Sequence, residues 1–212
     1  LPFALDENPT RLTQMTSKAL DLLDGQNDKG FFVMIEGSQI DWCGHANDIA
    51  CAMGEMDDFA KSIEQAKAYV DKNPDTLLVI TADHSTGGLT LGAHGQYKWE
   101  TEVVKGVKAT AGTITDELQK TDDLKSVWQR YTNIEFTEEN SIKLEQAKKM
   151  GDKALLLAVK DIINHASFTG WTTGGHTAID VQVFAYGQRA KDFYGSQNNT
   201  DIADKLIDFI KQ

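Results

Sequence analysis

The chain has 212 residues, of which 41% are hydrophobic and 25% are charged, and its formal net charge is −11. This length and apolar content suit one layered domain with a packed core. The acidic balance argues against nucleic acid or an anionic membrane as a partner, because a protein binds either of these through clustered Lys and Arg. No run approaches the roughly 20 apolar residues that span a bilayer. The chain opens at Leu1 without a signal-peptide pattern, so we expect a mature form or a piece of a longer protein.

The first half of the chain predicts helices and buried strands in alternation. Residues 10–24 carry their apolar side chains on one helical stripe. Residues 31–35 and 76–81 are continuous apolar runs, which are typical of strands buried on both faces. Between them, residues 46–71 show the apolar spacing of one long helix, which ends before Pro74. Strand, helix and strand in this order predict a βαβ unit with parallel strands.

The second half predicts mainly helices. Residues 92–150 are densely charged, with apolar residues spaced for short helices, so we expect a helical insertion or cap. Residues 154–164 predict another helix, residues 181–186 a strand near the sheet edge, and Thr200 the start of a terminal helix. The predicted fold class is therefore α/β, a mostly parallel sheet sandwiched between helices, with residues 1–212 as a portion of a single domain.

The two cysteines, Cys43 and Cys51, are eight residues apart. If both lie on one helix, a rise of about 1.5 Å per residue separates them by about 12 Å, which is too far for a disulfide. We therefore expect two small buried thiols.

The first group of chemistry-bearing residues follows the apolar run 31–35. Glu36 comes directly after it, at the carboxyl end of the predicted strand, where open α/β sheets bind ligands. Asp41 and His45 are four residues apart, so on a helical turn both side chains project from one face and can reach a single cation. The alternative is a solvated acid in a charge pair at the start of a helix.

The second group follows the apolar run 76–81. Asp83 and His84 are adjacent, and both can ligate one metal only if the backbone bends there. Gly87 and Gly88 are consistent with such a loop. The alternative is an Asp that caps the next turn beside a core His.

The third group contains His176, which alone could be an ordinary surface residue. Together with Asp41 and His45 it would give a zinc ion three protein ligands and one open position, the arrangement of catalytic zinc sites. We interpret His94 and His165, which lie outside these groups, as non-catalytic.

In combination, the three groups resemble the alkaline phosphatases. The family pattern reads Glu-Gly-x-x-Ile-Asp-x-x-x-His after one strand and Thr-Ala-Asp-His after another. It then reads His-Thr before a strand of the form Val-x-Val-x-Ala-Tyr-Gly. This chain carries these motifs in the same order and spacing at residues 36–45, 81–84 and 176–187. The similarity extends over the whole chain and implies an alkaline-phosphatase-like fold.

The resemblance also implies two zinc ions, one magnesium ion and the hydrolysis of phosphate monoesters through a phosphoserine. Trp42 stands where some members of the family have Lys or His, which leaves the metal preference and the pH optimum open. The implied ligands are Asp41, His45 and His176 for the first zinc, Asp83 and His84 for the second zinc, and Glu36 for magnesium.

The family's Asp-Ser-Ala turn, which holds the nucleophile, does not occur in this sequence. We therefore interpret the chain as the C-terminal part of an alkaline phosphatase, with no catalytic nucleophile of its own and no efficient turnover alone. The resemblance implies a periplasmic or secreted, usually homodimeric parent, and an exposed sheet edge predicts self-association of the fragment. The alternatives are another phosphotransferase or phosphodiesterase of the same superfamily, or a non-catalytic metal-binding module.

Overall fold

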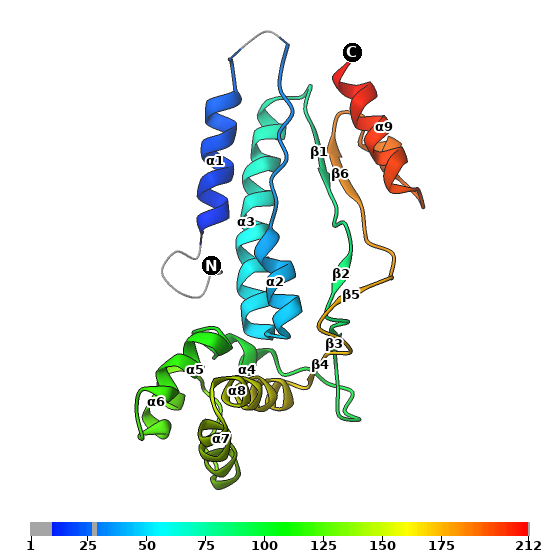
Figure 1. The fold of residues 1–212 in the computed structure, drawn as a ribbon. Coiled ribbons are helices and arrows are strands. Elements are labelled where there is room, and N and C mark those ends of the chain that lie inside the picture. Colours follow the sequence, from blue (N-terminus) through cyan, green and yellow to red (C-terminus); the bar gives the residue numbers. More distant parts are fainter. Residues whose placement is uncertain (1–9, 27–28, 212) are drawn as a thin grey trace. The chain divides into compact units, whose positions relative to one another are not determined.

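The computed structural model describes residues 10–26 and 29–211, which divide between two compact units (Figure 1). Helix α3 (Ile49–Lys72) contributes residues to both units. Among the described residues, no helix combines the length and the apolarity that crossing a membrane requires. Unit 1 comprises residues 37–57 and 85–178, and unit 2 comprises the described residues of 10–36, 58–84 and 179–212.

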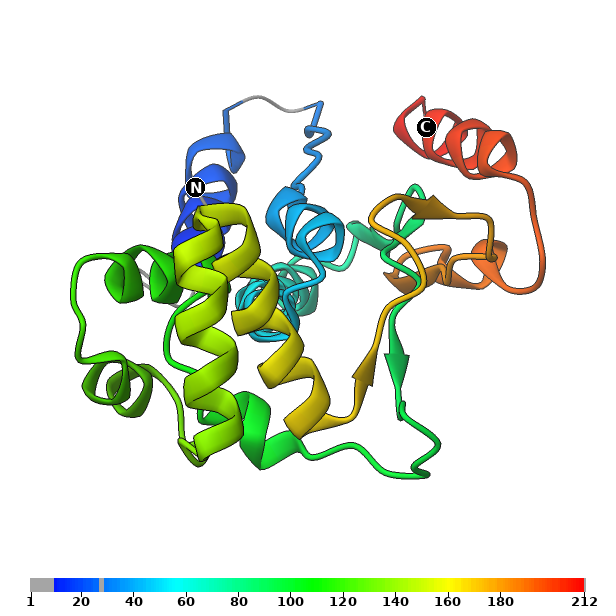
Figure 2. The same cartoon turned by 60° about the horizontal axis from the view of Figure 1, so that its bottom comes forward.

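Unit 1 is a group of helices around a hydrophobic core. Helix α8 packs against α4, α5 and α7, and Figure 2 shows α7 and α8 side by side. The largest side chain in the core is Trp128, which is fully buried together with Ile114, Leu144 and Leu155. The helices of this unit, besides the first part of α3, are α2 (Ser38–Ala46), α4 (Thr101–Lys105), α5 (Ala111–Gln119), α6 (Leu124–Tyr131), α7 (Glu138–Met150) and α8 (Asp152–Ser167).

Three of these helices begin at a polar side chain that caps their first backbone N–H groups. The hydroxyl of Thr110 accepts from the N–H of Thr113, and the hydroxyl of Thr137 caps α7 in the same way. The carboxylate of Asp123 caps α6. Such caps satisfy donors that the helix itself leaves unpaired, which is why these short helices begin at these residues.

Two short antiparallel strand pairs connect segments of unit 1 that are distant in sequence. Strand β2 (Ser85–Thr86) pairs with β5 (His176–Thr177), and β3 (Thr90–Leu91) pairs with β4 (Thr169–Gly170). The first pair places Thr86 directly opposite His176.

Unit 2 contains helix α1 (Arg11–Leu23), the rest of α3, strands β1 (Leu77–Ile80) and β6 (Phe184–Gly187), the 3-10 helix η1 (Ala190–Phe193) and helix α9 (Asn199–Ile210). The buried carboxylate of Asp58 in α3 accepts hydrogen bonds from the first backbone N–H groups of α1, at 2.8 Å from Leu12 and 3.0 Å from Thr13. This carboxylate supplies the cap that α1 lacks at its own N-terminus.

Most of the predicted elements are present. Helix α1, helix α8 over residues 154–164, the terminal helix and strand β1 lie where the sequence predicts them. Strand β6 covers the second half of the strand predicted at 181–186. Residues 92–150 hold helices α4 to α7, and their role as an insertion or cap stays a prediction, as does the assignment of residues 1–212 to a portion of a single domain.

The predicted pairing of the strands is wrong for the described part of the chain. The run 31–35 forms no strand ladder there, and β1 pairs with β6 in antiparallel order, so the parallel βαβ unit is not observed. The run nevertheless has the alternation of a strand, because Phe32 and Met34 are 60% and 79% exposed while Phe31, Val33 and Ile35 are half-buried. Apolar content favours an extended backbone, but it does not specify which strand lies alongside.

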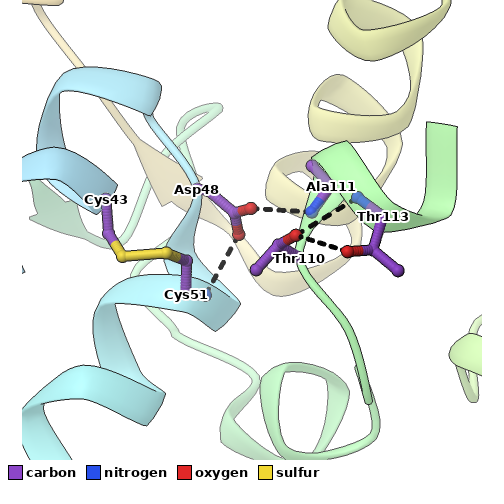
Figure 3. Close-up of a disulfide and its surroundings, with 6 residues drawn as sticks. All are labelled: Cys43, Asp48, Cys51, Thr110, Ala111 and Thr113. Carbon is purple, nitrogen blue, oxygen red and sulfur yellow. Dashed lines mark hydrogen bonds between the residues drawn. A yellow bond between two sulfur atoms is a disulfide. The ribbon is translucent and has the colours of Figure 1, made fainter. Parts of the chain in front are cut away.

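The helix predicted over 46–71 is present as α3, but Cys43 lies on a separate helix before it, and the turn between the two helices contradicts the prediction of two buried thiols. Helix α2 ends at Ala46, Asn47 adopts a left-handed conformation with φ 52°, and α3 begins at Ile49. The chain therefore reverses between Cys43 and Cys51, whose Cα atoms lie 5.4 Å apart and whose sulfur atoms form a disulfide (Figure 3).

The buried carboxylate of Asp48 holds the same turn (Figure 3). It accepts hydrogen bonds from the backbone N–H groups of Cys51 at 3.1 Å and Ala111 at 2.7 Å, and so joins the starts of α3 and α5. Burial raises the pKa of this carboxyl, although both N–H groups and the positive charge of Lys160 oppose the shift. Lys160, in α8, donates to the carbonyl of Ala46 at 2.6 Å, and this bond connects the end of α2 to α8.

Candidate metal centre

Three of the predicted ligands, Asp41, His45 and His176, lie together in unit 1. Helix α2 carries Asp41 and His45 one turn apart, and β5 begins with His176. One donor atom from each of the three residues can be chosen so that all lie within 4.8 Å of one another. Within the described ranges, no other group of three or more His, Cys, Asp or Glu side chains meets this condition.

The distances between the donor atoms fit a single small cation. The Nε2 atoms of His45 and His176 are 3.2 Å apart. One Asp41 carboxylate oxygen, Oδ2, lies 3.4 Å from Nε2 of His45, and the other, Oδ1, lies 3.9 Å from Nε2 of His176. A tetrahedral zinc ion, with ligand bonds of about 2.0–2.1 Å, leaves about 3.3 Å between neighbouring donors. Two imidazole nitrogens and one carboxylate are also a donor set that suits zinc.

Hydrogen bonds orient two of the three ligands. The Nδ1 atom of His45 lies 2.7 Å from the carbonyl oxygen of Gly174. Because a carbonyl only accepts, Nδ1 carries the proton and Nε2 keeps its lone pair for a metal. The hydroxyl of Thr86 donates to the Asp41 carboxylate, and Thr86 pairs with His176 in the β2–β5 ladder. One threonine therefore connects a ligand on α2 to a ligand on β5.

The donor group is open to solvent on one side. The side chains of Asp41, His45 and His176 are 35%, 42% and 51% exposed. Trp42, the neighbour of Asp41, is 65% exposed. A cation held by these three residues would keep at least one coordination position free for another ligand, as catalytic rather than structural zinc sites do.

The second predicted pair, Asp83 and His84, lies in unit 2 at the turn that follows β1. The His84 Nε2 atom is 3.2 Å from an Asp83 carboxylate oxygen, and the His84 N–H donates to the other oxygen at 3.1 Å. Both side chains therefore turn to one side, as ligation of one metal requires. Gly87 and Gly88, which begin the next loop, have positive φ angles of 81° and 56°. Their role in a second zinc site stays a prediction.

The predicted magnesium ligand, Glu36, also belongs to unit 2. Its side chain is exposed, and it directly precedes Gly37, the residue before α2. Its role stays a prediction too. His94 and His165, which we interpreted as non-catalytic, are exposed and lie with their ring centroids 4.2 Å apart. Neither belongs to the group of three donors.

Comparison with known proteins identifies the family. The family model for alkaline phosphatase matches residues 1–212. Alkaline phosphatase 3 of Bacillus subtilis (strain 168) is 41% identical over 200 residues, which cover 92% of this chain and 43% of that protein. The chain thus spans less than half the length of this curated relative.

Solved structures agree with this result. The cold-active alkaline phosphatase from the psychrophile Shewanella sp. superposes with a TM-score of 0.95 at 46% identity, over 99% of this chain and 53% of that one. A variant of the TAB5 alkaline phosphatase, solved with Mg bound in its M3 site, has a TM-score of 0.62 at 28% identity, over 100% of this chain and 44% of that one. On the family match over its entire length, together with the 41% identity to the Bacillus enzyme, the chain belongs to the alkaline phosphatase family.

Proposed function

We propose that this chain is the metal-binding part of an alkaline phosphatase, an enzyme that hydrolyses phosphate monoesters. The single observation that carries the proposal is the spacing of the donor atoms of Asp41, His45 and His176, which fits one tetrahedral cation. Thr86 and the carbonyl of Gly174 fix the orientation of two of these donors before any metal arrives. Membership of the alkaline phosphatase family supplies the reaction class.

In this proposal the chain holds three metal ions. Asp41, His45 and His176 bind the first zinc, Asp83 and His84 contribute to the second, and Glu36 binds magnesium. When bound, the metals stabilise the negative charge on the attacking and leaving oxygens of the phosphate ester. The exposure of the first donor group leaves room for a small phosphate ester to approach it. The Mg bound in the solved TAB5 variant supports a magnesium site in this family.

The proposal places the nucleophilic serine, and with it the phosphoserine intermediate, in sequence that this chain does not contain. The 43% coverage of the Bacillus relative supports this view. We accordingly expect no efficient turnover from the 212 residues alone. Secretion or export to the periplasm, a homodimeric parent and self-association of this chain are further parts of the proposal. Secretion or export and the homodimeric parent derive from the family resemblance. Self-association derives from the exposed apolar side chains of the run 31–35.

Zinc titration of the 212-residue chain tests the metal centre. Binding should weaken at least about tenfold in His176→Ala, because one of three protein ligands is lost. His165→Ala is the matched control, since it removes an exposed histidine outside the donor group and should leave zinc binding unchanged. Equal zinc binding by His176→Ala and the unsubstituted chain would refute the proposed site.

An activity assay tests the rest of the proposal. The chain, supplied with an aryl phosphate at alkaline pH and excess zinc and magnesium, should show almost no turnover. Turnover within about tenfold of a full-length relative would contradict the placement of the nucleophile outside this chain. The open donor group also predicts exchangeable zinc, whereas a purely structural metal module would hold its ion in a closed coordination sphere.

A further inference from the structure

The side-chain amide of Asn47 connects the two segments that carry the donor group. Asn47 follows the last residue of α2, two residues after His45. Its Nδ2 atom donates to the carbonyl of Gly44 inside α2 at 3.2 Å and to the carbonyl of Thr173 at 2.9 Å. Thr173 lies in the loop that leads into β5 and His176. A single carboxamide therefore bridges the helix of two ligands and the loop of the third.

This bridge lies beside a second one. The imidazole of His45 contacts the carbonyl of Gly174, the residue after Thr173. Two consecutive carbonyls of the loop are thus held by two side chains from the end of α2. One such bond would let the loop pivot, whereas two adjacent bonds fix both its distance from the helix and its direction.

Asn47 is itself held firmly in place. Its backbone has φ 52° and ψ 40°, a left-handed conformation that Asn adopts more readily than most residues. Its N–H donates to Gly44 at 3.0 Å, and its carbonyl accepts from the amide of Asn164 in α8 at 3.4 Å. The amide oxygen of Asn164 in turn accepts from the indole of Trp171, in the segment before Thr173. The position of Asn47 is therefore set by the core helix α8 as well as by α2.

We propose that Asn47 is a positioning residue of the metal centre, which holds the loop before His176 at the distance from α2 that lets one zinc ion contact all three donors. The inference rests on the proposed function, because it assumes that Asp41, His45 and His176 bind zinc. Without the amide of Asn47, the Thr173 carbonyl loses its link to α2 and the His45–Gly174 contact remains as the neighbouring tether. Removing partners that orient metal ligands typically weakens metal affinity about 10- to 100-fold.

Asn47→Gly is the informative substitution, because glycine keeps the left-handed backbone and removes only the amide. Asn73→Gly is the matched control. The amide of Asn73 donates to a carbonyl near the end of a helix, that of Tyr69 at 2.9 Å, but it belongs to unit 2 and contacts no residue of the donor group. Both variants remove a hydrogen bond from a carboxamide to a helix carbonyl, and Asn47→Gly alone also removes the bond to the Thr173 carbonyl.

The experiment compares zinc dissociation constants, measured by competition with a chromophoric chelator, in the 212-residue chain and its variants. We expect Asn47→Gly to weaken zinc binding about 10-fold or more and Asn73→Gly to change it less than about twofold. With chelator present and no zinc, the two variants should melt within a few degrees of each other. Cobalt in place of zinc provides a second readout, because its visible absorption reports coordination geometry and should change only in Asn47→Gly.

The result that would overturn the inference is zinc binding by Asn47→Gly within about twofold of the unsubstituted chain, or an equal loss in Asn73→Gly. His176→Ala, titrated in parallel, separates this failure from that of the proposed function. If the unsubstituted chain binds no zinc, or if His176→Ala binds it equally well, the proposed metal centre fails and the inference with it. If His176→Ala loses zinc but Asn47→Gly does not, only the positioning role fails.

Discussion

Removing the disulfide between Cys43 and Cys51 should lower the free energy of unfolding of unit 1 by about 2.5 kcal/mol. The bond joins residues eight positions apart, and the loop-closure entropy that a crosslink of this span removes from the unfolded chain gives this value at 25 °C. Both cysteines are buried, so the double variant Cys43→Ala/Cys51→Ala keeps small apolar side chains there and buries no unsatisfied hydroxyl.

Urea unfolding followed by tryptophan fluorescence measures this change selectively, because every tryptophan of the chain belongs to unit 1. These are Trp42, Trp99, Trp128 and Trp171. Reductant added to the unsubstituted chain should lower its free energy of unfolding by a similar amount, and the double variant should not respond to reductant. The reasoning fails if the variant unfolds within about 0.5 kcal/mol of the unsubstituted chain, or if reductant affects both equally.

Three further predictions concern buried or hydrogen-bonded side chains. Burial raises the pKa of Asp48, so its stabilising contribution is complete below the ordinary pKa of 3.8 and is lost as the pH rises through the folded-state value. The unfolding free energy relative to the non-titrating Asp48→Asn should therefore fall as the pH rises above 3.8, and a constant or rising difference would contradict this. Burial and a hydrogen bond to Asp24 raise the pKa of Tyr69 to about 12, so alkaline titration of phenolate absorbance should show a late component that Tyr69→Phe removes. Trp128→Ala should cost about 3–5 kcal/mol by calorimetry, because its ring is fully buried, whereas exposed Trp42→Ala should change stability by less than about 0.5 kcal/mol.

The donor group was predictable because its chemistry depends on local spacing. Two side chains four residues apart on a helix face the same way whatever surrounds them, so Asp41 and His45 could be paired from sequence alone. Adding His176 depended on counting the ligands that a zinc ion needs and on the family resemblance, since it lies 131 positions from His45. Nothing in the local pattern shows that the β2–β5 ladder places it opposite Thr86.

The prediction of two buried thiols failed because hydrophobic periodicity does not report backbone reversals. A single helix carrying both Cys43 and Cys51 would keep them apart, yet Asn47 ends α2, adopts the left-handed conformation and turns the chain before α3. This one residue brings Cys43 and Cys51 within bonding distance. An Asn between two helical segments is a recognised stop signal, so the turn, although not the disulfide, could have been found. Strand partners are harder to predict, because pairing depends on contacts that are remote in sequence.

The extended run at residues 31–35 has a consequence for how the chain exchanges hydrogen with water. Its amides belong to no strand ladder in the described part of the chain, and every second side chain faces solvent. In deuterium oxide these amides should label early, well before those of the neighbouring helix α3, whose N–H groups are held by helical hydrogen bonds. If another surface covers Phe32 and Met34 and pairs with this backbone, these amides should take up deuterium more slowly.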